Sequence, residues 1–381
     1  MKNRYENIVC IWLLPTLSRG YYLQSLFKEF TKLFQKTTIY TGIWPGYISG
    51  YENSFKVIVM RKTKIFKIGK TQYGNPVVIT LPDISMLFKL IKSEAKVVLT
   101  NTFTLWTLFA IILKPLKNWI IIDIYSGSAP LADLKNYRIR TYSRRIMSKF
   151  IDLYLTNSNG GKSYLMSVLK QNKDKILVYP YQIPDKELFK HYTKIKTKAN
   201  THKFLYVGRF ERAKGIDTLL KVVNHLYKDG YYDWSLEIIG DGSERDNILI
   251  FINENSLSSH VKVYNWMKYN DLGDHFIGCD VFVFLSREDI WGMVVAEAML
   301  FKKPIICSSG AGISELVKDE YNGFIVDPEN ICYIADVFKK FIENRQLSRL
   351  MGNNAYSTIS QFTAEKAVLL LRDFINIKMN S

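Results

Sequence analysis

The sequence has few cysteines and histidines, and it lacks a long apolar run. The four cysteines among 381 residues form no C-x-x-C pair, so neither a disulfide framework nor a zinc site is expected. No stretch reaches the roughly 18 apolar residues that span a bilayer. The longest, at 103–113, ends at Lys114-Pro115 and predicts a buried helix that stops there. All five histidines lie at or after His191, so no histidine can act in the first half.

Charge is the unusual quantity in the composition. With 48% apolar and 23% charged residues the chain is not of a disordered or fibrous type, but its net charge is +17. Residues 1–200 hold 32 basic and 11 acidic residues, a balance of +21, whereas residues 201–381 hold 20 and 24, a balance of −4. This split indicates two domains, one of which faces an anionic partner such as lipid headgroups, nucleic acid or a phosphorylated substrate.

Short apolar strands alternate with helices along the chain. Continuous apolar strands of this kind predict a parallel sheet covered by helices on both faces, which binds ligands beyond the carboxyl ends of its strands. The pattern is clear in the second half and weaker in the first, so we expect an α/β protein with two Rossmann-like domains facing each other across a cleft. A polar, lysine-rich linker near 181–200 places the domains at 1–185 and 186–360.

The loop at 208–215, Gly-Arg-Phe-Glu-Arg-Ala-Lys-Gly, is the most specific segment. It follows a predicted strand at 204–207 and precedes a helix that Asp217 can cap. Arg209 and Lys214 can converge there on one diphosphate, because arginine offers a two-pronged grip and lysine a point charge. A solvated basic turn is the alternative.

An acidic segment follows the predicted strand that ends at Leu285. Asp289 precedes the next helix, and Glu297 lies inside it, eight residues later. Gly292 would let the backbone approach a phosphate, and the first amides of the helix favour an anion. Carboxylates beside a phosphate site suit sugar and ribose hydroxyls. The alternative is that Asp289 only caps the helix and Glu297 is an exposed helix residue.

Five short motifs occur together between residues 204 and 330. They are Val207-Gly208-Arg209-Phe210…Lys214-Gly215-Ile216-Asp217, Ile239-Gly240-Asp241-Gly242, Asp289-x-Trp291-Gly292…Glu297-Ala298-Met299, Lys303-Pro304-Ile305-Ile306 and Asn322-Gly323-Phe324-Ile325-Val326-Asp327-Pro328. In this order and spacing they resemble the retaining nucleotide-sugar glycosyltransferases of GT-B fold, the glycosyltransferase group 1 (family 4) superfamily. The first half matches that family only in its general layout.

The resemblance implies a role for each donor residue. Arg209 and Lys214 would hold the donor diphosphate, and Glu297 would accept hydrogen bonds from ribose. Asp289 stands at the first position of the family's E-x7-E pattern, whose acid contacts the transferred sugar; aspartate is one methylene shorter than the usual glutamate. Further donor contacts are expected from Gly20 in the first domain and from Gly208, Gly240, Gly242, Asn265, Trp266, Gly292, Met293 and Val294.

Asp123 is the candidate for a catalytic helper in the first domain. Some relatives carry a histidine after the corresponding strand, whereas this chain has none before His191. Asp123 could orient an acceptor hydroxyl or stabilise positive charge on the sugar, and a structural cap is an equal alternative. The chain has no D-x-D, so a metal-dependent donor site of the GT-A type is not expected. The resemblance implies metal-independent, retaining transfer with no cofactor beyond the nucleotide sugar.

The predicted function is transfer of a hexose from a UDP or GDP sugar to a glycan or lipid-linked acceptor in surface polysaccharide or lipopolysaccharide synthesis. The basic first domain would bind an anionic membrane from the cytoplasmic side, and a terminal helix at 361–381 would cross back onto that domain. Two alternatives stay open. One is an epimerase or phosphorylase of the same fold. The other is a non-catalytic protein that binds membrane or nucleic acid through the basic clusters at 61–70 and 137–145, although no nucleic-acid fold signature accompanies them and nucleic acid is not expected as a partner.

Overall fold

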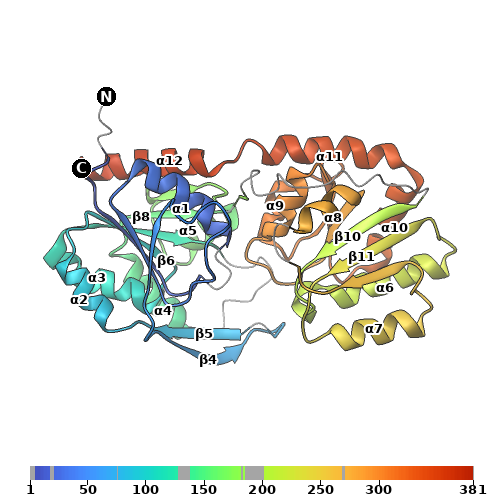
Figure 1. Cartoon of the computed structure of the whole chain (residues 1–381), viewed down its shortest axis with the longest axis horizontal. Coiled ribbons are helices and arrows are strands. Elements are labelled where there is room, and N and C mark those ends of the chain that lie inside the picture. The colour runs from blue at the N-terminus through green and yellow to red at the C-terminus, as the bar shows by residue number, and fades with distance from the viewer. Residues whose placement is uncertain are drawn as a thin grey trace.

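The protein is built from two parallel β-sheets that are each covered by helices on both faces (Figure 1). The computed structural model describes residues 5–17, 21–74, 76–127, 138–181, 183–184, 201–267 and 271–380. The two Rossmann-like sheets confirm the predicted α/β fold class. Among these residues no helix is both long and apolar enough to cross a bilayer. All four cysteines are unpaired; Cys10, Cys279 and Cys307 are buried and Cys332 is exposed.

The first sheet has the strand order β3-β2-β1-β6-β7-β8-β9, and every neighbouring pair is parallel. Side chains alternate along β1, so Trp12 packs under one layer of helices and Leu13 under the other. Both faces are therefore apolar, which explains the unbroken apolar run. The elements are β1 (Cys10–Leu14), α1 (Tyr21–Leu33), β2 (Thr37–Thr41), β3 (Lys56–Val59), β6 (Val97–Asn101), α3 (Leu105–Lys117), β7 (Ile120–Tyr125), α4 (Arg138–Ser148), β8 (Leu153–Thr156), α5 (Asn159–Ser167) and β9 (Ile176–Val178).

A separate antiparallel hairpin interrupts the first domain between β3 and α2 (Ser85–Lys92). Its strands are β4 (Lys64–Lys70) and β5 (Pro76–Leu81), with a register shift between Lys67 and Gly69. Every residue of β4 is exposed. The sequence indicates a basic cluster at 61–70 but predicts no strands here, so the hairpin is a new feature of the structure.

The second sheet has the order β12-β11-β10-β13-β14-β15, again with parallel neighbours. Helices α6, α7 and α10 cover one face, and α8, α9 and α11 cover the other. The elements are β10 (His202–Val207), α6 (Ile216–Lys228), β11 (Trp234–Ile239), α7 (Arg245–Glu254), β12 (Val261–Tyr264), α8 (Leu272–Gly278), β13 (Val281–Phe284), α9 (Met293–Leu300), β14 (Ile305–Ser308), β15 (Gly323–Val326), α10 (Ile331–Glu343) and α11 (Arg345–Ile359).

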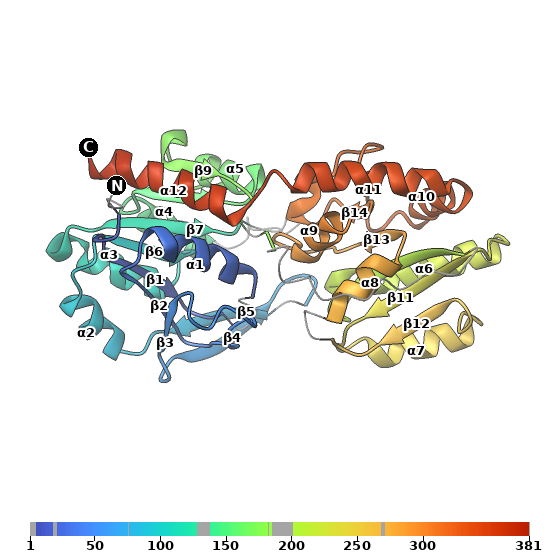
Figure 2. The same ribbon diagram turned by 45° about the horizontal axis from the view of Figure 1, so that its top comes forward.

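The last helix, α12 (Ala364–Met379), lies on the first domain beside α1 (Figure 2). Thr363 caps it by accepting a hydrogen bond from the backbone N–H of Lys366. Ala367 and Ile375 are fully buried in the core of the first domain. The chain therefore crosses back from α11 on the second domain to the first domain, where α12 packs.

Two local predictions are wrong. The helix α3 does not stop at Lys114-Pro115 but continues to Lys117. Proline removes one amide donor from the last turn, and Asn118 in the left-handed conformation closes the helix by donating its N–H to the Lys114 carbonyl at 2.8 Å. Asp217 is not a helix cap, because α6 begins one residue earlier and Gly215 precedes it.

Candidate functional site

The second sheet brings the two predicted donor loops together. Its strand order reverses between β10 and β13, so the loops that follow these central strands, 208–215 and 285–292, leave the sheet next to each other. The backbone N–H of Arg287 donates to the carbonyl of Ala213 at 2.9 Å and joins the two loops. Open α/β sheets bind their ligands at switch points of this kind.

Lys214 and Asp289 meet at the centre of this junction. The Lys214 ammonium lies 2.5 Å from Asp289 Oδ2 and also donates to the carbonyl of Glu288 at 3.1 Å. The other carboxylate oxygen of Asp289 accepts from the backbone N–H of Trp291 at 3.1 Å. The two side chains are only 12% and 22% exposed, which strengthens their attraction compared with a surface pair. The predicted diphosphate-binding cation and the predicted sugar-binding acid thus occupy one place.

The helix α9 supplies the other predicted groups of the acidic loop. Gly292 precedes its first residue with φ +105°, a conformation that favours glycine, and an added Cβ would lie 2.9 Å from Ile313 Cγ2. Met293 and Val294 form the first turn, where amide groups lack helical partners. Glu297 lies one turn further on and is only 5% exposed, so the alternative that it is an exposed helix residue is wrong.

The remaining predicted donor residues line the same edge of the sheet. Gly208 directly follows β10, and Arg209 forms an ion pair with Glu211. A Cβ on Gly240 would come within 1.9 Å of the Gly208 carbonyl, so glycine is needed there for the two loops to pack, with or without a ligand. An added Cβ on Gly242 would likewise clash with the backbone of Phe210, which lies in the loop at 208–215.

Asn265 and Trp266 follow β12, at the outer end of the strand order. Both are exposed, and the indole of Trp266 keeps 67% of its surface. An exposed ring at the carboxyl edge of the sheet is available to stack on a base. The base-binding role stays a prediction.

Arg287 is a residue of the site that sequence patterning misses. Its guanidinium donates to both carboxylate oxygens of Asp217, at 2.6 and 3.0 Å, to Thr218 Oγ1 at 2.7 Å and to the Arg212 carbonyl at 2.7 Å, and it pairs with Glu329. Its side chain is 6% exposed. Burial lowers the pKa of Arg287, but the bonds to the two carboxylates outweigh it and raise that pKa overall.

The pKa of Asp217 moves in the complementary direction. Burial raises the pKa of Asp217, but the hydrogen bonds and charge of Arg287 lower it by more than burial raises it. The pKa is therefore lowered overall, and the carboxylate stays ionised. The pair ties the start of α6 and the loop after β10 to the loop that carries Asp289. No sequence signal reveals it, because Asp217 lies 70 residues from Arg287.

Asp123 is fully buried in β7. Its carboxylate accepts hydrogen bonds from the backbone N–H of Thr102 at 3.1 Å and from the hydroxyl of Thr100 at 3.3 Å. Burial raises its pKa to about 7, against the lowering effects of Thr100 and of the charge on Arg144. The bonds to the loop after β6 match the structural alternative, and a catalytic role stays a prediction.

Replacing Asp123 by asparagine should make stability less dependent on pH. The raised pKa means that the folded state holds a proton that the unfolded state releases above pH about 4. The contribution of this residue to stability is therefore complete below that pH and is lost as pH rises through about 7. Between about pH 5 and 8.5, urea unfolding should show the free energy of unfolding of the wild type falling by about 3 kcal/mol relative to Asp123→Asn. Parallel pH profiles of the two proteins would contradict the burial effect.

Contacts across the domain boundary bring the carboxyl edges of the two sheets face to face. The Glu315 carboxylate, after β14, accepts from the backbone N–H groups of Asn159 and Gly160 at the start of α5, at 2.7 and 2.8 Å. The hydroxyl of Thr71 in the hairpin turn donates to Glu288 Oε2 at 2.6 Å. The first domain therefore reaches the loop that carries Asp289. Gly20 and residues 185–200 of the predicted linker lie outside the described residues.

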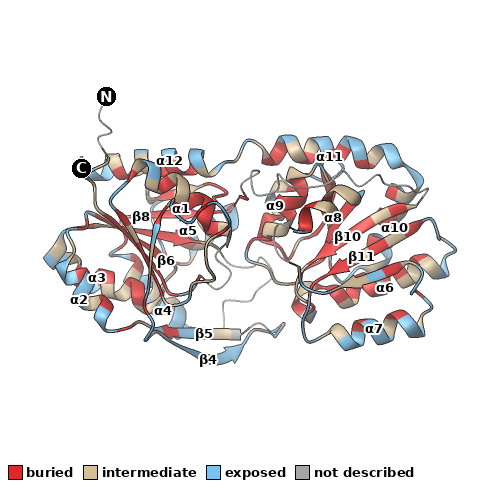
Figure 3. Ribbon diagram, in the orientation of Figure 1, coloured by how far each residue is buried: buried red, intermediate tan, exposed pale blue. Residues whose placement is uncertain are grey.

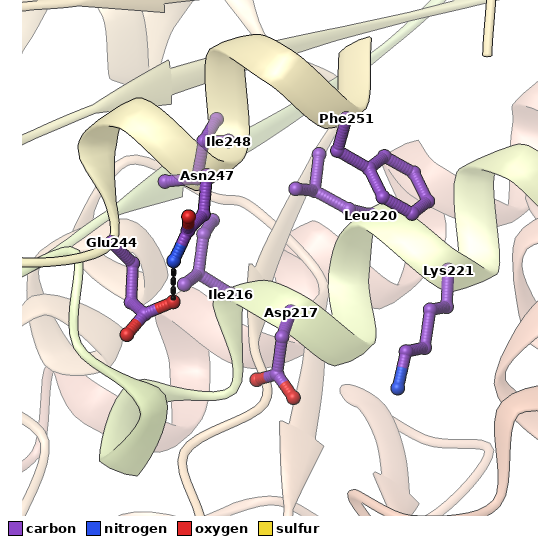
Figure 4. A pocket seen from close by; sticks show the side chains of 8 residues that line it. All are labelled: Ile216, Asp217, Leu220, Lys221, Glu244, Asn247, Ile248 and Phe251. Atoms are coloured by element: carbon purple, nitrogen blue, oxygen red, sulfur yellow. Dashed lines mark hydrogen bonds between the residues drawn. The ribbon is translucent and has the colours of Figure 1, made fainter. Parts of the chain in front are cut away.

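A small groove lies elsewhere on the second domain, between α6 and α7 (Figure 4). Its volume is about 100 Å³, below the roughly 300 Å³ of a typical ligand pocket. Glu244 and Asn247 hydrogen bond to each other at one end. It contains none of the predicted donor residues, so we assign it no role.

Comparisons with known proteins agree with this geometry. Over 97% of the chain, the structure resembles the HepE protein of Anabaena in complex with UDP, with a TM-score of 0.75 at 16% identity and all of that chain covered. The fold is therefore that of the GT-B glycosyltransferases. Residues 189–358 match the family model described as glycosyl transferases group 1, the group that the motifs between residues 204 and 330 resemble.

Curated relatives match this chain over part of its length. An uncharacterised glycosyltransferase of Methanocaldococcus jannaschii is 29% identical over 168 residues, which cover 44% of this chain and 46% of the relative. The lipopolysaccharide core biosynthesis glycosyltransferase LpsE of Rhizobium meliloti is 27% identical over 173 residues, 45% and 49% of the two chains. The matched part of this chain thus spans about half the length of these relatives.

Proposed function

We propose that the protein is a glycosyltransferase that moves a hexose from a UDP or GDP sugar to a glycan or lipid-linked acceptor. The contact between Lys214 and Asp289 at the switch point carries this proposal, because a cation that could bind a diphosphate lies beside an acid that could bind sugar hydroxyls. Two similar proteins, one in complex with UDP and one named for lipopolysaccharide core biosynthesis, support surface glycan synthesis as the setting.

The site suggests how transfer would proceed. Lys214 would exchange its bond to Asp289 for a donor phosphate oxygen, and Arg209 with the first amides of α9 would add positive charge there. The bond between the sugar C1 and the diphosphate breaks, and the acceptor oxygen bonds to C1 from the same face. The acceptor proton passes to the departing phosphate oxygen. Glu297 would hold the ribose hydroxyls.

The family resemblance is why we propose a retaining, metal-independent reaction. Lys214 and Arg209 support metal independence, because they offer fixed positive charge where the leaving group becomes negative. Most of the rate enhancement would then come from positioning and electrostatic preorganisation.

The first test is a thermal-shift screen of UDP and GDP sugars, followed by a transfer assay. A bound donor should raise the melting temperature, and the nucleotide should be released only when a glycan or lipid-linked acceptor is added. Isomerised sugar in the absence of an acceptor would instead identify an epimerase. No shift with any nucleotide sugar would contradict the proposed donor site.

We also propose that the protein works at the inner face of an anionic membrane. The excess of 32 basic over 11 acidic residues in the first 200 residues supports this, since lysine and arginine near an anionic surface are attracted to it. A lipid-linked acceptor would be presented at the same surface.

A further inference from the structure

We propose that residues 61–74 and 76–92, which include the hairpin β4–β5 and the helix α2, bind an anionic lipid bilayer. We call this segment the docking surface. The inference deepens the proposed function by naming the part of the first domain that would meet the membrane, and it depends on apolar exposure as well as charge.

The docking surface exposes an unusual number of large apolar side chains. Figure 3 shows β4 exposed along its length at the lower edge of the first domain. In the hairpin and α2, nine such side chains are between 39% and 70% exposed: Ile65, Phe66, Ile68, Val78, Ile79, Leu81, Ile84, Phe88 and Ile91. Single exposed apolar residues need no explanation, but a cluster within 30 residues marks an interaction site.

Strand pairing gathers some of these side chains on one face of the hairpin. Phe66 pairs with Ile79 and Lys64 with Leu81, so these four side chains share a face. The opposite face carries Thr80, which is buried, together with the exposed Ile65, Lys67 and Val78, so the domain covers that face only near Thr80. The first face is apolar except for Lys64 at its end.

The helix α2 continues the pattern with two apolar faces. Met86 and Leu90, four residues apart, are fully buried in the core of the first domain. Ile84, at the start of the helix, and Phe88 lie on the opposite side and are 70% and 61% exposed. Only one of the two apolar faces of this helix is buried by the domain, so the other can contact a second apolar environment.

The exposed charges of the docking surface are all positive. It holds seven basic residues, all exposed: Arg61, Lys62, Lys64, Lys67, Lys70, Lys89 and Lys92. Its one acidic residue, Asp83, is buried and accepts hydrogen bonds from the backbone N–H groups of Ser85 and Lys62, at 2.9 and 3.3 Å. No ion pair between described residues involves the seven basic side chains.

This combination favours a bilayer over other anionic partners. Lysines beside exposed isoleucine, leucine and phenylalanine allow the apolar chains to enter the headgroup region while the ammonium groups contact lipid phosphates. Nucleic acid would use the lysines but would leave the aliphatic chains in water. The hairpin also ends at the site, since Thr71 in its turn bonds to Glu288 beside Asp289. A bilayer bound here would bring a lipid-linked acceptor close to the donor loop.

Vesicle flotation tests the proposal with the full chain. We compare vesicles of phosphatidylcholine with vesicles that also contain phosphatidylglycerol. The variants are Ile84→Ser/Phe88→Ser and Lys64→Ser/Lys67→Ser/Lys70→Ser, with Leu249→Ser/Ile250→Ser on the exposed side of α7 as the matched apolar control. The wild type and the control should bind the anionic vesicles. Each docking-surface variant should bind them at least about tenfold more weakly.

Several results would overturn the proposal: no binding of the wild type to anionic vesicles, equal binding to both vesicle types, or variants that bind as well as the control. All the substituted side chains are exposed, so we expect the variants to fold. An unchanged melting temperature checks this. A nucleotide-sugar thermal shift measured on the same proteins separates the two proposals. Failure of the donor site removes that shift and leaves vesicle binding, whereas failure of the docking surface does the reverse.

Discussion

Lys214→Ala should lower sugar transfer about 100- to 1,000-fold while the protein stays folded. In the donor complex the ammonium of Lys214 would stabilise the charge that develops on the leaving diphosphate, and alanine provides no substitute. The substitution also leaves the carboxylate of Asp289 without the ion pair that the structure places at 2.5 Å. That negative charge would then repel the donor phosphates, so binding of the donor should weaken as well.

Steady-state kinetics with a matched control isolate this effect. Lys221→Ala removes a lysine from the exposed side of α6, seven residues further on, and should leave kcat and KM unchanged. Lys214→Arg keeps the charge but changes the geometry and should recover only part of the activity. If Lys214→Ala retains the wild-type kcat and KM, the donor site is misassigned. Unfolding of the variant, monitored by its melting temperature, would be a different failure and would point to the Asp289 contact as structural.

The parts of the site that could be predicted are those formed by residues that lie close together in the sequence. The loops at 208–215 and 285–292 each follow an apolar strand, and parallel strands place such loops at one edge of a sheet. The candidates Lys214, Asp289 and Glu297 follow from that placement together with family motifs. Their common location was therefore predictable, although the direct contact between Lys214 and Asp289, 75 residues apart, is visible only in the structure.

The parts that could not be predicted depend on contacts between distant segments. The hairpin β4–β5 has apolar and basic residues on both faces, so its sequence lacks the alternation that indicates a half-buried strand. The bond of Glu315 to Asn159 depends on how the two domains face each other. Asp217 has the residue type of a helix cap, but its real partner, Arg287, comes from another loop. In each case the structure is determined by tertiary contacts and not by local propensity.

Arg287→Met should destabilise the second domain by about 3–5 kcal/mol, the largest stability effect that we expect from a single substitution. Methionine fills part of the space but leaves the carboxylate of Asp217 without its bidentate partner, and it also removes the bonds to Thr218 and the Arg212 carbonyl. Glu329 contributes less, because its side chain is 64% exposed and water can replace the arginine. Urea unfolding of the wild type and the variant measures the difference.

A surface ion pair provides the control. Arg372→Met on α12 breaks the contact of Arg372 with Asp373, which are 29% and 56% exposed, and should change stability by less than about 1 kcal/mol. The double variant Arg287→Met/Asp217→Asn should recover part of the loss, because it no longer buries an uncompensated charge. Equal losses in the single and double variants would show that packing, and not charge, is what Arg287 supplies.

The same network should respond to acid in a defined direction. Arg287 holds the pKa of Asp217 below its ordinary value of 3.8, so this carboxylate stabilises the folded protein above that pH, and its contribution is lost as pH falls through the lowered pKa. The stability difference between the wild type and Arg287→Met/Asp217→Asn should therefore shrink on acidification below about pH 4. The bound donor should also partly restore the melting temperature of Arg287→Met, by mass action on the folded state. A variant that loses stability and regains none of it with the donor would have lost donor binding, which would show that Arg287 is needed to hold the donor loop.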